Sequence, residues 1–547
     1  MQRRIYWFIL SLTIIGFITI FLTNNSIDSL YVLGADSDYS PAKSSKSQSN
    51  SPSNDSHSVS LLSNSSDSKS ITALGNASCS AIGCHGQSLP KDSLYMKIPE
   101  KESWRYSYTH WQAYDPHQQA YLALESELAK HMIHLLNQGE DFVAKADQKN
   151  NRNSKGNKNG QTITNKKQPW REATKEERCL VCHANPMIAR VDETDPALNM
   201  SQLTALRAEG VSCESCHGDA SSWRQAHVGW ENREGKSEKY REHGMIWLND
   251  LASRSRNCAS CHIGAPEMKL AGKTIPARDV THELIAAGHP RLNFEFASFQ
   301  SQLSPHWQEI NRTDGSKPGP EFSARTWLTG RSTQIETALR LLETHQNNDW
   351  PELADFQCYS CHQSIRSETH PPMRKRHSGM WNWQPAPMME ELFTLNQNRF
   401  PQLNTALVSY LEVKKSLETT SGRAMVPNAT LTKSIQLWES QSNAFAKNQL
   451  TSNQLGEFWQ KADTLCDQIL TWDESAQLLY GIDAWRLSIN PQPLPYRPNP
   501  NDLWQQMKSV SAKLRFPRNQ NSPLFYTVPE STRQELKKIL RAVGSKQ

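Results

Sequence analysis

The chain has 547 residues, of which 37% are hydrophobic and 21% charged, and it contains 11 cysteines. This length suits one large domain or two to three ordinary ones, which excludes a small protein held together by disulfides alone. There is only one long apolar run, so a membrane protein with several spans is excluded. The net charge of +5 is small for this length and argues against nucleic acid as a partner.

The N-terminus predicts export. Residues 1–4 are basic, and residues 5–22 form an apolar run without a charge. Such a run is short for a membrane-spanning helix and long for a cleaved signal, so residues 1–35 are predicted to be either a single-pass anchor or a signal. The leading arginines would place the rest of the chain on the periplasmic side of the cytoplasmic membrane, or in an equivalent exported compartment.

The rest of the chain divides by composition. Residues 36–72 are rich in serine and are predicted to be a disordered linker. Residues 73–380 hold every Cys–His motif and contain a disordered basic insert at 147–168. Residues 381–547 lack such motifs, and apolar residues recur there at helical spacing. No convincing run of alternating strands occurs, so the fold is predicted to be mostly α, with helices arranged around stacked cofactors and a helical C-terminal region.

Ten of the 11 cysteines form five pairs, and a histidine directly follows each pair. Four pairs have the spacing C-x-x-C-H, and the first has C-x4-C-H. This pattern is typical of covalent haem attachment, in which two thiols bind one edge of the porphyrin and the histidine binds iron. The predicted attachment cysteines are Cys79, Cys84, Cys179, Cys182, Cys213, Cys216, Cys258, Cys261, Cys358 and Cys361. The predicted proximal ligands are His85, His183, His217, His262 and His362.

Two rival interpretations explain this pattern less well. Zinc also uses C-x-x-C pairs, but it needs four ligands from partnered pairs and does not require a histidine after each one. Disulfides across a two-residue gap belong to redox enzymes, in which five copies would be unusual. The motifs therefore predict five covalently attached haem c groups. The remaining cysteine, Cys466, lies on an apolar stretch and is predicted to be a buried core thiol.

His117 is the best-placed candidate for a second axial ligand. A helix is predicted to begin after Asp115 as its N-cap, with Pro116 at its first position, and to end before Gly139. A histidine that opens an apolar stripe is either a ligand or a core residue; the first is preferred for His117 and the second for His131. The stripe consists of His117, Tyr121, Leu124, Leu128, His131 and Leu135.

Four further histidines complete the candidate set of second ligands. His227 lies in a helical segment ten residues beyond His217. His282 and His289 are seven residues apart, which on a helix places both on one face, about 10 Å from each other. His306 is the fifth choice. The residues that could replace it are His243, His345, His370 and His377.

Three segments carry a family resemblance: residues 104–121, 210–223 and 286–296. They resemble the multihaem c-type cytochromes related to cytochrome c-554 and, more distantly, hydroxylamine oxidoreductase, over about residues 75–370. The resemblance implies closely packed haems that act as an electron wire, mostly with two histidines per iron. Some relatives leave one haem five-coordinate and act on nitrogen or sulfur oxides. The chain has five haem motifs, whereas the c-554 type has four haems and the hydroxylamine enzymes have eight. The motif C-x-x-C-K, which carries the lysine-ligated haem of pentahaem nitrite reductases, is absent.

Three functions are compatible with these features. The preferred one is electron transfer by a membrane-tethered pentahaem cytochrome whose partners are redox proteins, such as a membrane-bound electron-transfer complex. The alternative is an oxidoreductase with one open haem, for which the first motif is the candidate, with Arg105, Tyr108 or His110 nearby. In the third, residues 381–547 dock a partner and the haems relay electrons. Tryptophans there are expected to be core residues.

Overall fold

The computed structural model describes residues 73–89, 104–138, 172–230, 240, 242–270, 273–290, 292, 294–303, 306, 307, 309, 318–347, 352–355, 389–419, 425–467, 472–489, 503–514 and 528–545. The predicted anchor 1–35, the linker 36–72, the insert 147–168 and the fifth motif, residues 358–362, lie outside this part of the chain. Within it, no helix is long and apolar enough to cross a membrane.

Short helices make up the described chain before residue 320, and many begin at a polar N-cap. Asp219 and Asp250 each accept a hydrogen bond from a backbone N–H of the following helix, at 3.0 and 3.3 Å. The helices are η2 (Asn76–Ser78), α2 (Ser107–Tyr114), η4 (Pro116–Glu125), α4 (Glu177–His183), η5 (Pro186–Ile188), α5 (Met200–Ala208), α6 (Cys213–His217), α7 (Ala220–His227), α9 (Leu251–His262), α10 (His282–Ala286) and α11 (Phe296–Gln302). In the same part, β1 (Met268–Leu270) pairs antiparallel with β2 (Lys273–Ile275).

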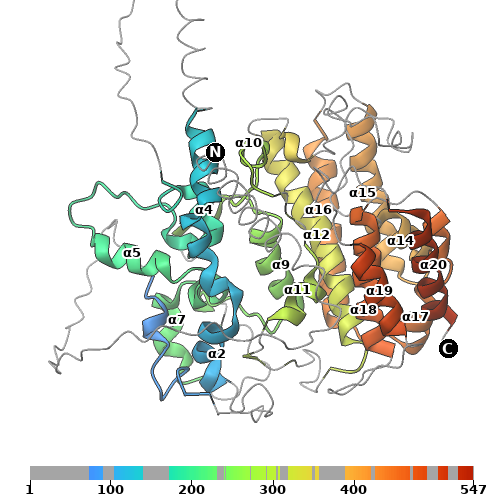
Figure 1. The fold of residues 1–547 in the computed structure, drawn as a ribbon, viewed down its shortest axis with the longest axis horizontal. Coiled ribbons are helices and arrows are strands. Elements are labelled where there is room, and N and C mark those ends of the chain that lie inside the picture. The colour runs from blue at the N-terminus through green and yellow to red at the C-terminus, as the bar shows by residue number, and fades with distance from the viewer. Residues whose placement is uncertain are drawn as a thin grey trace, which may run out of the picture.

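Longer helices form the rest of the described chain and lie side by side in Figure 1, on the right of the view. They are α12 (Phe322–Asn347), η6 (Leu353–Asp355), α14 (Met389–Asn396), α15 (Pro401–Thr419), α16 (Asn428–Lys447), α17 (Ser452–Glu457), η9 (Ala462–Asp467), α18 (Trp472–Ile489), α19 (Leu503–Lys513) and α20 (Glu530–Ser545). The prediction of a mostly α fold with little sheet is confirmed.

The largest hydrophobic core belongs to the C-terminal helices and includes α12. Trp438, Trp459 and Trp485 are at most 1% exposed, as expected for core residues, and Trp327 of α12 packs against Trp459 and Trp485. Cys466 lies in η9 and is fully buried, which confirms the predicted core thiol. The clusters among the motif-bearing helices are much smaller, so side-chain burial stabilises this part less than the C-terminal part.

The helices α9, α11 and α12 join the two parts, and they lie in the centre of Figure 1. Arg256 of α9 donates hydrogen bonds to the buried carboxylate of Glu336 on α12, at 3.0 Å to both oxygens. Phe296 packs directly onto α12 at Gly330, where an added Cβ would lie only 2.5 Å from the Phe296 Cβ. A glycine is therefore required at this crossing.

The helix predicted between Asp115 and Gly139 is broken. Its first ten residues form the 3-10 helix η4, and Ser126 is extended, with ψ at 157°, before an α-helix begins. A 3-10 turn has about three residues instead of 3.6, so the two pieces do not share one face. The predicted stripe is therefore wrong in its second half, where Leu128 and His131 are exposed.

Candidate functional site

Three of the C-x-x-C-H motifs form the last turn of a helix. Helix α4 ends at His183, α6 at His217 and α9 at His262. Residues three and four apart lie next to one another on a helix, so the two thiols and the imidazole of each motif point to the same side. This is the arrangement needed to attach one porphyrin edge and to bind its iron from below.

The first motif reaches a similar arrangement through a turn. The backbone N–H of Cys84 donates to the carbonyl of Ala81 at 2.8 Å, and that of His85 donates to the carbonyl of Cys79 at 3.3 Å. This turn takes up the two additional residues of C-x4-C-H and brings His85 back to Cys79. Cys84 is exposed, so this motif lies at the surface of the molecule.

Glu214 ties the first motif to the third. It lies between the two cysteines of the third motif, and its carboxylate accepts hydrogen bonds from the backbone N–H groups of Leu74 and Gly75, at 2.9 and 3.0 Å. In return, the Asn76 side chain accepts from the backbone N–H of Cys213 at 3.1 Å. Burial raises the pKa of Glu214. Sequence reasoning missed both residues because the contacts cross more than a hundred positions.

Each motif histidine in the described chain has a second histidine nearby, and three pairs have measured separations. An imidazole nitrogen binds a metal ion at about 2 Å, and its ring centre lies about 1 Å further away, so two imidazoles on opposite sides of one ion have centres about 6 Å apart. The observed pairs fit this distance. They are His85 with His227 at 6.2 Å, His262 with His117 at 6.1 Å, and His217 with His306 at 6.5 Å.

His183 lies close enough to His289 to act on it electrostatically. Burial lowers the pKa of His289, and repulsion by the charged form of His183 lowers it further. The prediction that His282 and His289 share a helical face is wrong. Helix α10 begins at His282 and ends at Ala286, and Gly288 follows with φ at 114°, a conformation that favours glycine.

Hydrogen bonds orient most of these imidazoles. The acceptors are mainly carbonyl oxygens, so the Nδ1 atom must carry the proton and the Nε2 atom keeps its lone pair for a metal ion. The Nδ1 partners are Trp104 O for His85 at 2.7 Å, Ala120 O for His183 at 2.9 Å, Pro290 O for His289 at 2.8 Å, Arg224 O for His227, and the Asp115 carboxylate for His117 at 2.8 Å.

Burial keeps the deepest imidazoles neutral. It lowers the pKa of His217 to about 3, and those of His262 and His306 to about 4. A neutral imidazole is the form that binds iron. Among the described residues, no three His, Cys, Asp or Glu side chains converge on a metal site. Each imidazole pair therefore offers two ligands, which suits an iron whose other four ligands are porphyrin nitrogens.

The thiols of different motifs lie against one another. Burial and the charge of Cys258 both raise the pKa of Cys216, which places the third and fourth motifs side by side. The Cys79 and Cys213 thiols also lie close enough to shift each other's pKa, and so do those of Cys182 and Cys261. The motifs therefore adjoin in the order first, third, fourth, second.

Residues 134–218 match a family model described as "Cytochrome c554 and c-prime". The matched segment contains the second and third motifs, whose thiols and histidines have the geometry described above. Over these residues the chain is similar to the multihaem c-type cytochromes of the cytochrome c554 type. This similarity implies covalently bound haem c and a role in electron transfer. No curated protein and no solved structure matches the chain.

His345 is not available as an axial ligand, although the sequence allowed it as a substitute for His306. Its Nδ1 and Nε2 atoms lie 2.7 Å from the carboxylates of Asp355 and Asp279. Burial alone would lower its pKa, but the hydrogen bonds to the two carboxylates raise it to about 10. His345 is therefore a charged link from the end of α12 to the end of η6 and to the loop at Asp279.

The free energy of unfolding is expected to fall as the pH rises from about 6.5 to about 10. His345 binds its proton more tightly in the folded protein than in the unfolded chain. Its contribution to the stability of the fold is therefore complete below its pKa in the unfolded chain, and it is lost as the pH rises through its pKa in the folded protein. The loss should amount to a few kcal/mol at most, since one pKa unit corresponds to about 1.4 kcal/mol. Denaturant titrations across this pH range should show the fall, and His345→Gln should remove it.

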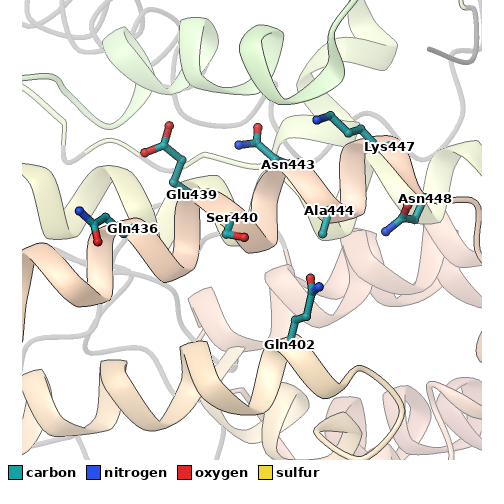
Figure 2. Close-up of a pocket in the computed structure, with 8 residues that line it drawn as sticks. All are labelled: Gln402, Gln436, Glu439, Ser440, Asn443, Ala444, Lys447 and Asn448. Carbon is teal, nitrogen blue, oxygen red and sulfur yellow. The ribbon is translucent and has the colours of Figure 1, made fainter. Parts of the chain in front are cut away.

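A pocket of about 530 Å³ in the C-terminal part carries none of this chemistry. Gln402 of α15 and one side of α16 line it, and Figure 2 shows Glu439, Asn443 and Lys447 pointing the same way along α16. Arg256 of α9 donates to the Asn443 side chain and to the Glu439 carbonyl, at 3.1 and 3.2 Å. The lining contains no cysteine or histidine, so it is not a haem attachment site.

Proposed function

We propose that the chain is an exported, membrane-tethered cytochrome that carries electrons along five closely packed haems. The observation that carries this proposal is the set of opposed imidazoles, with ring centres 6.1 to 6.5 Å apart beside the first, third and fourth motifs. A bound haem supplies one-electron chemistry at its iron. With both axial positions taken by imidazole, the iron has no open position for a substrate, which favours transport over catalysis.

The ligand pairs follow from these positions. His85 and His227 would hold the haem of the first motif, and the pairs His183–His289, His217–His306 and His262–His117 those of the second, third and fourth. The fifth motif lies outside the described residues. We assign His282 as the second ligand opposite His362 of this motif, because the other four preferred candidates are already assigned to other haems.

The contacts between thiols support a path through the haems that departs from their order in the sequence. Each cysteine sulfur would mark one edge of its haem, so two neighbouring sulfurs would bring two haem edges together. The contacts Cys79–Cys213, Cys216–Cys258 and Cys261–Cys182 connect the haems in the order first, third, fourth, second. The first haem would end this series at the surface, where Cys84 is exposed.

The tether and the partners belong to the same proposal. The apolar run 5–22 and the serine-rich linker 36–72 would hold the cytochrome near the membrane on its periplasmic side, within reach of membrane-bound redox proteins. The alternative enzyme with an open haem at the first motif has less support. His227 lies opposite His85, and the backbone N–H of Tyr108 donates to the His85 carbonyl at 3.0 Å.

Haem stoichiometry tests the proposal directly. Mass spectrometry of the denatured protein should find five covalently bound haems, since each motif supplies two thioether bonds that survive unfolding. A count of four that leaves Cys79 and Cys84 free would remove the first motif from the path. A count of zero would refute the proposal. A low-temperature spectrum of the oxidised protein should contain no high-spin haem, whereas one high-spin haem would favour the enzyme.

A further inference from the structure

The Nδ1 partners of the paired imidazoles differ in charge. His85, His183 and His289 donate to neutral carbonyl oxygens. Within the described chain, the buried Nδ1 atoms of His217 and His306 have no hydrogen-bond partner. His117 differs from both groups because its Nδ1 lies 2.8 Å from a carboxylate oxygen of Asp115.

Asp115 is built into the fold at this place. It is 8% exposed, and it is the N-cap of η4. The same Oδ1 atom accepts the backbone N–H of His117 at 2.9 Å and faces its Nδ1. The position of the carboxylate relative to the ring is therefore fixed by the start of the helix.

The other side of this site is apolar. His262, whose ring centre lies 6.1 Å from that of His117, packs against Phe294 and Phe299 at 6.0 and 5.1 Å between ring centres. Phe294 is 1% exposed and Asp115 is 8% exposed, so water screens the carboxylate only weakly. In such surroundings a nearby negative charge acts strongly.

A ligand imidazole that donates to a carboxylate is a stronger electron donor than one that donates to a carbonyl, because the anion draws the Nδ1 proton toward itself. A more basic ligand stabilises oxidised iron more than reduced iron. We propose that Asp115 sets the reduction potential of the haem held by His117 and His262, and makes that haem harder to reduce. This inference rests on the proposed ligation and adds to it a residue that binds no haem itself.

The test is Asp115→Asn in the full holoprotein, followed by a spectroelectrochemical titration. Asparagine is as good an N-cap as aspartate, so the variant keeps η4 and removes only the charge. We expect one haem to move to a more positive potential while all haems remain low-spin. The matched control is Asp250→Asn, which removes a buried N-cap charge from α9.

Three results would overturn the inference. In the first, no haem changes its reduction potential more in Asp115→Asn than in Asp250→Asn, so the Asp115 charge has no specific effect through His117. In the second, the shift is toward more negative potential. In the third, a high-spin haem appears, which means that Asp115 holds the ligand in place and does not tune it. Failure of the proposed function looks different, since the unmodified protein would then already lack haem or show a high-spin signal.

Discussion

Replacing His306 by alanine is expected to convert one haem from low-spin to high-spin and to raise its reduction potential. The imidazole of His306 lies 6.5 Å from that of His217 between ring centres, and burial lowers the pKa of both, to about 4 and about 3. Imidazole stabilises oxidised iron, so losing one ligand favours reduction. Electron paramagnetic resonance of the oxidised protein measures the spin change, and a potentiometric titration measures the shift.

The same replacement should cost little stability. The Nδ1 atom of His306 has no hydrogen-bond partner in the described chain, so no buried group loses a bond when the ring is removed. Two thioether bonds of the third motif would still hold the porphyrin. His131→Ala is the matched control, because His131 is exposed and its loss should leave the spectrum unchanged. An unchanged spectrum in His306→Ala, with a lower melting temperature, would make His306 an ordinary core residue.

The sequence predicted the chemistry of the site better than its geometry. The spacing of a motif is local, so the convergence of its thiols and histidine follows from the helical turn that α4, α6 and α9 each supply. The pairing of His117 with His262 joins residues far apart in the chain, and no local pattern determines it. The Asp115 carboxylate was predicted only as an N-cap, although the same oxygen also faces His117 Nδ1.

Long-range packing also hid the longest helix. Sequence patterns gave short segments up to residue 370, whereas α12 runs from Phe322 to Asn347. Most of its residues are buried, polar ones such as Arg325, Arg331 and Thr333 among them, so it has no polar face to mark it as amphipathic. Arg331 donates to Gln477 of α18, and the Thr333 hydroxyl bonds with that of Ser442 on α16; these contacts exist only in the folded chain.

Arg331 is the side chain whose loss should destabilise the fold most. It is fully buried, donates to the carbonyl of Phe294 at 2.6 Å and to the Gln477 side chain at 2.5 Å, and lies 3.8 Å from the buried carboxylate of Glu295. Arg331→Met removes the positive charge that this arginine places beside the Glu295 carboxylate. Breaking a buried ion pair from one side typically costs about 3–5 kcal/mol, because the remaining charge stays buried.

The pH dependence of this loss distinguishes charge from packing. Burial raises the pKa of Glu295 and Arg331 lowers it, so removing the arginine should raise that pKa further. A raised pKa in the folded state means that stability falls as the pH rises, so Arg331→Met should be least destabilised in mild acid. Adding Glu295→Gln removes the unbalanced charge and keeps one oxygen as an acceptor, although the N–H groups of Ala297 and Ser298 donate to different oxygens of the carboxylate. Denaturant unfolding should therefore show the double variant to be more stable than Arg331→Met at neutral pH; equal stability would assign the loss to packing alone.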